Sequence, residues 1–277
     1  MAASSTSSAA SLVASLRKKT GYPIGKCKEA LTKHGNDLDA AETWLLEQAK
    51  KEGWAKAEKL MGRKAQQGLI GLVVKNRQAA MVVVNCETDF VARNDKFRSL
   101  VEKVTHTVLD KCNPQPLSST DIPSILTLDT QSLGSLDLNS GTGNLSDLVA
   151  ESIGLLSENI VLGRACLMGV KKGTLCGYTY SPSTIPPSTV AMGTYAALVH
   201  LLPAGREWED EEAARNLGMQ IGQHIVGMNP SSVYGSSDNA EPLVGQKYLL
   251  DSTLTVGDLL KQKNTKVSSF VRYALSD

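Results

Sequence analysis

Two β-rich runs in close succession constrain the fold of this chain more than any other feature. Residues 68–74 read GLIGLVV, residues 79–85 read AAMVVVN, and the polar segment 75–78 between them is short enough for a turn. Apolar residues are consecutive in both runs instead of alternating with polar ones, which indicates that at least one strand is covered on both faces. The sequence therefore predicts an antiparallel hairpin with other parts of the chain packed against it.

Three short helical patterns precede this hairpin, between residues 12 and 53. Their apolar residues recur at three- and four-residue steps: Leu12, Val13 and Leu16, then Cys27, Ala30 and Leu31, then Leu38, Ala41, Leu45 and Ala49. The second pattern ends at His34-Gly35, where glycine suits a helix end, and Asn36 or Asp37 can cap the third, which is expected to end at Gly53. These patterns predict a small three-helix domain.

The charge of the chain is distributed unevenly, although its total is close to zero. The whole sequence has 29 basic and 28 acidic residues, whereas residues 12–64 have twelve basic and seven acidic ones. The local excess of five positive charges is typical either of a basic binding face or of an ordinary solvated helix surface. The near-neutral net charge does not predict attraction to a nucleic acid or a membrane surface, and of the two readings of the local excess the solvated helix surface is favoured over nucleic-acid contact. We expect neither a nucleic acid nor a membrane as partner.

Helical and strand patterns alternate after the hairpin. A helix is predicted from Phe97 to Val108, with Asn94 or Asp95 as its cap, and residues 113–144, rich in Pro, Ser, Thr and Gly, are expected to form loops. The other expected elements are a helix at 146–156, a second hairpin with strands at 164–180 and 190–202, a helix at 210–228, strands at 247–250 and 267–274, and a capped helix at 255–262. This order predicts an α+β protein with antiparallel sheets, not a doubly wound nucleotide-binding fold.

The sequence lacks the residue patterns of an enzyme active site, a metal centre or a membrane span. Its five cysteines and four histidines are scattered singly, without a CxxC, HExxH, GxSxG or GxxxxGK[ST] motif. No apolar run approaches the roughly 18 to 20 residues that a spanning helix needs. We therefore expect a non-enzymatic intracellular protein with reduced thiols and without a cofactor or metal.

The segment NCETDFVARNDKF, residues 85–97, connects the first hairpin to the helix that follows. Phe90, one of three phenylalanines in the chain, stands in this connection beside Asp89. One interpretation is that Phe90 packs onto its own sheet and Asp89 caps the turn. The other is that Phe90 projects into a pocket of a partner while the carboxylate binds donors at the rim of that pocket. The residue types leave both interpretations open.

Four stretches of the chain resemble the translation elongation factor Ts family, in the same order and at similar spacing. They are LRKKTGYPIGKCKEAL from residue 16, GNDLDAAETWLL, NCETDFVARNDKF and GQKYLLDSTLTVGDLLKQKNTKVSSFVRYAL. The resemblance extends over nearly the whole chain and includes an intact TDFV signature, here Thr88, Asp89, Phe90 and Val91. It implies a guanine-nucleotide exchange factor for the GTPase elongation factor Tu.

The resemblance also implies a domain organisation and a mechanism. A UBA-like three-helix domain is expected at 12–55, after a disordered start or processing remnant at 1–11. A core of two α+β subdomains with antiparallel sheets is expected at 56–204 and 205–277. In the family, the Asp-Phe pair reaches the magnesium and phosphate site of the GTPase, and the phenylalanine wedges between helices there.

Further contact residues are implied by position. The contacts of the family fall here on Arg17, Ile24, Gly25 and Lys28 in the N-terminal domain and on His224 in the core. Bacterial members often carry two methionines where this chain has Ile24-Gly25, so the apolar contact is expected to be weaker here. For His224 an equal alternative is a polar residue at the edge of an apolar helix face.

One departure from the bacterial pattern indicates a branch of the family. Between His224 and Gly245 the chain has only about twenty residues, rich in Ser, Gly, Asn and Pro, and the helical hairpin that mediates dimerisation in bacterial members does not fit there. The chain thus resembles the mitochondrial branch, which implies the mitochondrial matrix and a one-to-one heterodimer with Tu. The alternative function is a ubiquitin-like or RNA-binding helical module on an α+β scaffold.

Overall fold

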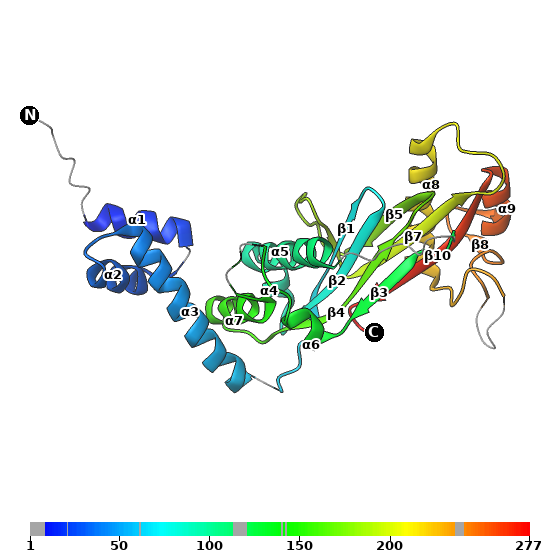
Figure 1. Cartoon of the computed structure of the whole chain (residues 1–277). Helices are drawn as coiled ribbons and strands as arrows, with labels where there is room; N and C mark the ends of the chain where they lie inside the picture. The colour runs from blue at the N-terminus through cyan, green and yellow to red at the C-terminus, as the bar shows by residue number, and fades with distance from the viewer. Residues whose placement is uncertain are drawn as a thin grey trace, which may run out of the picture. The chain divides into compact units, whose positions relative to one another are not determined.

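The computed structural model describes residues 9–20, 22–60, 62–112, 121–139, 141, 143–235 and 241–277. It divides into an N-terminal unit, made of residues 1–63 and 147–159, and a C-terminal unit, made of residues 64–146 and 160–277 (Figure 1). Residues 1–8 of the predicted disordered start and 113–120 of the predicted loop region lie outside the described residues. None of the helices in the described ranges is both long and apolar enough to cross a membrane.

The N-terminal unit contains the three predicted helices and a fourth from further along the chain. These are α1 (Ala9–Thr20), α2 (Ile24–Lys33), α3 (Leu38–Leu60) and α7 (Leu145–Leu156). The predicted apolar faces meet in one buried cluster that includes Leu16, Leu31 and Leu45, with Leu155 of α7 packed against it. Asp37 caps α3 as expected, because its Oδ1 accepts hydrogen bonds from two backbone N–H groups of the first turn.

Helix α3 differs from the prediction, because it continues past Gly53 to Leu60. Gly53 is buried inside the helix, where a Cβ would lie 1.8 Å from the carbonyl oxygen of Ala150 in α7. The glycine therefore serves a close approach of two helices within this unit and not a helix end. Lys50 and Lys56 of α3 bond to Asp147 and to the carbonyl oxygen of Gly154 on either side of this contact.

The C-terminal unit is built on two antiparallel sheets and a small ribbon. Strands β1 (Gln67–Lys75) and β2 (Gln78–Cys86) form the predicted hairpin at the centre of a five-stranded sheet with the order β3-β4-β2-β1-β6. A three-stranded sheet has the order β10-β7-β5, and β8 pairs with β9. The other strands are β3 (Ser124–Leu128), β4 (Ile160–Gly169), β5 (Thr174–Tyr180), β6 (Ala191–Gly193), β7 (Tyr195–Pro203), β8 (Lys247–Tyr248), β9 (Asp251–Thr255) and β10 (Thr265–Ala274).

The two larger sheets pack face to face and are covered by helices on their outer faces. One buried cluster joins residues of both sheets, among them Met81 and Leu198. Helix α5 (Asp95–Lys111) contacts β1 and β2, and α8 (Glu211–Met228) contacts β5 and β7 (Figure 1). Residues 68–73 and 79–84 are consequently buried without interruption, which confirms the prediction from their continuous apolarity.

Two further predictions about the C-terminal unit need correction. The region 113–144, expected to form loops, contains β3 and the short helix α6 (Thr130–Gly134), because β3 finds hydrogen-bond partners along β4. The expected strand at 164–180 is two strands, separated by a turn that includes Gly173 at φ +73°. Its first part belongs to β4 in the five-stranded sheet, and only β5 pairs with β7 as the predicted second hairpin.

The remaining helix predictions are confirmed. Asn94 caps α5 and Asp210 caps α8, each by accepting backbone N–H groups of the first turn. Thr255 and Asp258 form a capping box at the start of α9 (Val256–Gln262). The structure is therefore of the α+β class, with an N-terminal helical region and a core of antiparallel sheets; the domain boundaries at 55/56 and 204/205 stay predictions.

Candidate partner-binding site

Phe90 lies on the surface of the C-terminal unit, at the corner where β2 meets the helices that follow it. Asp89, Phe90 and Val91 of the TDFV segment lie in a single turn of helix, α4 (Asp89–Ala92), which Thr88 caps shortly after the end of β2 at Cys86. Phe90 is 80% exposed, whereas Phe97 on α5 is fully buried. Val82, Val84 and Phe97 are fully buried, whereas Phe90 is exposed and does not pack onto its own sheet.

The backbone that carries Phe90 is fixed by hydrogen bonds on both sides of the ring. Thr88 Oγ1 accepts the backbone N–H of Val91 at 3.3 Å, and the carbonyl oxygen of Thr88 accepts that of Ala92 at 3.2 Å. The buried thiol of Cys86 also lies 3.2 Å from the Thr88 carbonyl oxygen. Asn94 then begins α5 by accepting the N–H of Lys96 at 2.9 Å. The exposed ring therefore stands on a rigid corner and not on a flexible loop.

Asp89 is paired within this corner but remains half exposed. Its Oδ2 lies 2.5 Å from Nη2 of Arg93, one helical turn later, and the two side chains are 47% and 62% exposed. Thr88, and not Asp89, provides the helix cap, so the capping role considered for Asp89 is taken by its neighbour. The carboxylate thus remains accessible to donors of another molecule, because a surface ion pair of this kind contributes only about 0 to 1 kcal/mol.

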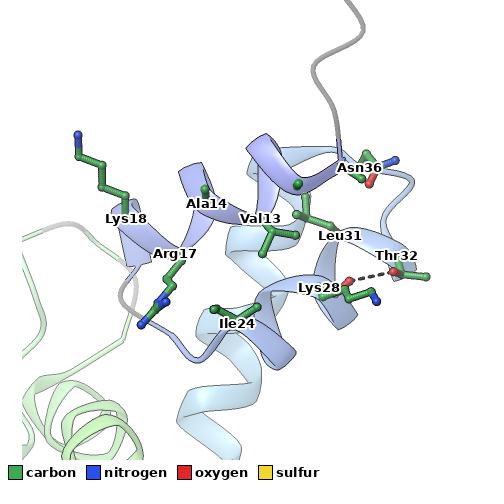
Figure 2. Close-up of a pocket in the computed structure, with 11 residues that line it drawn as sticks. Val13, Ala14, Arg17, Lys18, Ile24, Lys28, Leu31, Thr32 and Asn36 are labelled. Carbon is green, nitrogen blue, oxygen red and sulfur yellow. Dashed lines mark hydrogen bonds between the residues drawn. The ribbon is translucent and has the colours of Figure 1, made fainter.

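A groove of about 840 Å³ runs between α1 and α2 in the N-terminal unit. Val13, Ile24 and Leu31 supply apolar surface along it, and Arg17, Lys18 and Lys28 are basic residues in its lining (Figure 2). No acidic side chain lines the groove within the described residues. Ile24 is 54% exposed, although it is a large aliphatic residue.

The groove therefore brings together three of the four N-terminal residues that the sequence nominated. Arg17, Ile24 and Lys28 line it, while Gly25 is exposed on α2 beside Ile24, with no atom within 4 Å of a Cβ built on it. Val13, Lys18 and Leu31 were not nominated, although the basic excess of residues 12–64 pointed to this region.

His224 occupies a different setting, inside the C-terminal unit. Its side chain is fully buried, Nε2 lies 2.9 Å from Oε1 of Gln246, and Nδ1 accepts the backbone N–H of Leu249 at 3.1 Å. Burial lowers the pKa of the ring below its ordinary value, and the hydrogen bond to Gln246 opposes that shift. Both ring nitrogens are thus used within the chain, in contrast to the exposed Phe90 and Ile24.

Comparison with known proteins places this architecture in a family. A family model described as "Elongation factor Ts, mitochondrial, N-terminal" matches residues 1–55, and one described as "Elongation factor TS" matches residues 87–241. The protein "Elongation factor Ts, mitochondrial" of Nematostella vectensis is 41% identical over 284 residues, which cover 95% of this chain and 97% of the relative. The chain belongs to the elongation factor Ts family.

Vertebrate relatives agree with this assignment. The proteins named "Elongation factor Ts, mitochondrial" of Salmo salar and Homo sapiens are 42% identical over 267 residues and 39% identical over 283 residues. These alignments cover 95% and 98% of this chain and 84% of each relative. Membership of an elongation factor Ts family assigns the protein to translation elongation.

The described residues also include buried thiols and scattered His, Asp and Glu side chains. Among them, no group of three or more His, Cys, Asp or Glu side chains could hold a metal ion. Burial raises the pKa of the Cys166 thiol to about 12 and that of Cys176 to about 11, so neither is a thiolate at neutral pH. The candidate site considered for this family member consists of exposed apolar and charged side chains at Phe90, at Asp89 and along the groove between α1 and α2.

Proposed function

We propose that this protein is a guanine-nucleotide exchange factor that binds elongation factor Tu and promotes release of GDP. The observation that carries the proposal is the 80% exposed ring of Phe90 on a hydrogen-bonded corner, in a chain of the elongation factor Ts family. A large aromatic ring is costly to expose to water, and its burial in a pocket of a partner is favourable. The ring enters the GTPase beside its magnesium and phosphate site and displaces the segment that supports the metal.

Asp89, Thr88 and Val91 have separate roles in this proposal. Asp89 binds donors at the rim of the pocket, and its pairing with Arg93 at 2.5 Å holds the carboxylate in place until the partner arrives. Thr88 and Val91 supply the acceptor and the donor of the hydrogen bond that orients α4. The four residues of the signature thus form one unit, in which Phe90 makes the apolar contact and the others fix its direction.

The energetics of exchange follow from linkage. A factor that binds nucleotide-free GTPase more tightly than the nucleotide complex must weaken nucleotide binding by the same ratio. A thousandfold weakening corresponds to about 4 kcal/mol of differential contact energy. A buried aromatic hot spot contributes about 2 to 4 kcal/mol, so Phe90 can supply most of this energy while other surfaces supply docking. Incoming GTP with magnesium restores the metal site and expels the ring.

The groove between α1 and α2 is the proposed docking surface of the N-terminal unit. Arg17, Ile24, Gly25 and Lys28 contact the partner there, and the apolar lining with basic residues and no acidic one suits an acidic segment with an apolar face. The location follows the mitochondrial names of the relatives, and we propose the mitochondrial matrix. We also propose a one-to-one heterodimer: in the described parts of residues 229–246 there is no helix that could form a dimerisation hairpin.

The decisive experiment is the rate of labelled GDP release from purified Tu, measured with and without the full-length protein. We expect acceleration that saturates with protein concentration, and a complex with one copy of each chain by sedimentation. An unchanged release rate at saturating protein would refute the proposed function. Serum albumin at the same concentration controls for non-specific stabilisation of free GTPase.

A further inference from the structure

Two turns at one end of the five-stranded sheet bring four basic residues together. Lys75 and Arg77 belong to the turn between β1 and β2, and Lys171 and Lys172 belong to the turn between β4 and β5. All four residues are exposed. Because β2 pairs with β4, the two turns lie side by side, although Arg77 and Lys171 are 94 residues apart in the sequence. These four residues form a basic tip that the order of the sequence does not reveal.

Hydrogen bonds hold the backbone of the basic tip in place. The backbone N–H of Val170 donates to the carbonyl oxygen of Arg77 at 2.9 Å, and the guanidinium of Arg77 donates to the carbonyl oxygen of Lys171. Nε2 of His200, which is buried on β7, donates to the carbonyl oxygen of Lys172 at 2.9 Å. The cationic side chains therefore project from two turns that are fixed to each other and to the sheet beneath them.

The charge of the basic tip is not neutralised within the chain. Within the described residues, Lys75, Arg77 and Lys172 take part in no ion pair. Asp121 and Lys266, near the second turn, are paired with each other at 3.7 Å and add no net charge. Like charges gathered on fixed turns repel one another, and a ligand that carries several negative charges relieves this repulsion. The tip is therefore suited to a polyanion.

A pocket of about 380 Å³ lies between the first turn and the end of α5, and its lining indicates which polyanion fits. Lys75 and Arg77 line it together with the exposed Asp110 of α5, which accepts a hydrogen bond from the side-chain amide of Asn139 at 2.8 Å. A carboxylate repels a phosphate but accepts a hydrogen bond from a hydroxyl group. RNA has a 2′-hydroxyl beside each phosphate, whereas DNA lacks it.

We propose that the basic tip and this pocket form a binding site for single-stranded RNA. The four basic residues bind successive phosphates, and Asp110 accepts a hydrogen bond from a ribose 2′-hydroxyl that turns into the pocket. A flexible strand can place one ribose in a concave site, whereas a membrane surface is flat. The near-neutral charge of the whole chain gave no expectation of such a partner, because the charges of the tip come from two distant segments.

The site lies away from Phe90 and does not rest on the proposed exchange function. In the hairpin of β1 and β2, Lys75 pairs with Gln78 at the basic tip, and Gln67 pairs with Cys86 at the end that leads to Phe90. Eight residue steps along a strand correspond to about 27 Å. The RNA site and the corner at Phe90 can therefore be occupied at the same time.

Phosphate contacts give the binding a salt dependence of predictable size. Four contacts to a single strand correspond to a slope of about −2.8 in a plot of log affinity against log salt, so affinity should fall about 50-fold between about 50 and 200 mM salt. Reversing two of the four charges should bring the slope to about −1.4 or closer to zero. It should also weaken binding at low salt at least tenfold, because each new carboxylate repels a phosphate.

The experiment measures fluorescence anisotropy of a labelled single-stranded RNA of mixed sequence with the full-length protein at several salt concentrations. Lys75→Glu/Arg77→Glu and Lys171→Glu/Lys172→Glu each reverse one half of the basic tip. Lys51→Glu/Lys59→Glu, at two exposed lysines of α3, makes the same change in total charge elsewhere and should bind RNA as the wild type does. Denaturant unfolding of each variant should give the wild-type midpoint, since all the changed side chains are exposed.

A DNA strand of the same sequence tests the role assigned to Asp110. The wild type should bind RNA about tenfold more tightly than DNA, which corresponds to one hydrogen bond to a charged group. Asp110→Asn should reduce this ratio to about threefold or less, because it removes the repulsion of DNA phosphates and weakens the bond to the 2′-hydroxyl. An unchanged ratio would remove Asp110 from the site.

Three results would overturn the inference. The first is the absence of RNA binding by the wild type at about 50 mM salt. The second is an equal loss in the control variant and in the two tip variants, which would mean that total charge and not the tip attracts RNA. The third is binding to vesicles of phosphatidylcholine and phosphatidylglycerol that is stronger than binding to RNA and is lost in the tip variants, which would assign the tip to a membrane surface. GDP release from Tu is a separate measurement, so failure of the exchange function leaves these results unaffected.

Discussion

Replacement of Phe90 by Ala tests the proposed wedge by separating binding energy from folding energy. A phenylalanine buries about 200 Å² when fully enclosed. With 80% of the side chain exposed, about 160 Å² is available to a partner, or about 4 kcal/mol at 25 cal/mol per Å². The remaining fifth corresponds to only about 1 kcal/mol of stability in the free protein. We therefore expect Phe90→Ala to reduce stimulated exchange by about 30- to 1000-fold, from a loss of about 2 to 4 kcal/mol.

The assay measures two quantities on the same variant. Labelled GDP release from Tu at saturating factor gives the maximal stimulated rate, and denaturant unfolding of the free factor gives stability. Phe97→Ala is the matched control, because Phe97 is fully buried and its loss should cost about 3 to 5 kcal/mol of stability. A large loss of stability in Phe90→Ala with normal exchange would refute the reasoning.

Three other perturbations have expected outcomes. Gly53→Ala should destabilise the N-terminal unit by about 1 to 3 kcal/mol, because the added methyl group overpacks against α7. This loss should exceed the helix preference of Ala over Gly, which is about 1 kcal/mol. Denaturant unfolding measures the change, and a gain in stability would contradict the expectation. Arg17→Glu/Lys28→Glu should raise the half-saturating factor concentration for exchange, less so in high salt; an effect independent of salt would exclude charge complementarity. Burial lowers the pKa of His200 and of His224 in the folded protein. The stability that their neutral forms contribute is therefore complete above about pH 6.5, the pKa of an unfolded histidine, and is lost as pH falls through the lowered pKa values. Unfolding midpoints should decrease as pH is lowered from 8 to 5, and midpoints that do not change with pH would contradict this expectation.

Local patterns in the sequence predicted the elements well where packing acts along one helix or one hairpin. The continuous apolarity of residues 68–74 and 79–85 required cover on both faces, and the structure provides α5 on one side and the three-stranded sheet on the other. The cap at Asn94 and the capped start of the helix at Thr255 were readable because a side-chain acceptor two or three residues before a free N–H acts locally.

Long-range packing was not readable in the same way. Gly53 has the local signature of a helix end, and only the approach of α7, about a hundred residues later, makes it an interior residue. The strand β3 lies in a segment of loop-like composition, and its hydrogen bonds to β4 decide its conformation. In both cases the deciding partner is distant in sequence, so composition and periodicity do not contain it.

The same contrast between local sequence patterns and long-range packing applies to the candidate site. The position of Phe90 in a connection between strand and helix raised the question of its role, but the residue types did not decide between burial and exposure, and the structure shows it 80% exposed. The family resemblance implied a partner contact at His224, with a polar residue at the edge of an apolar helix face as the alternative; the buried bonds to Gln246 and Leu249 were not predicted. One strand was predicted at 247–250, whereas β8 ends at Tyr248 and a turn at Leu249 and Leu250 leads into β9.

For binding, the order of the backbone beneath an exposed contact residue matters as much as its side chain. Ordering the backbone of one residue costs about 1 to 2 kcal/mol, so ordering a flexible loop of four residues on binding would cost about 4 to 8 kcal/mol. A single aromatic contact of about 2 to 4 kcal/mol could not offset that cost. In this protein the backbone at Phe90 is already ordered on folding, by the hydrogen bond that Thr88 accepts from Val91. A substitution that removes this hydrogen bond without touching the ring, such as Thr88→Ala, should therefore weaken the proposed partner complex as Phe90→Ala does.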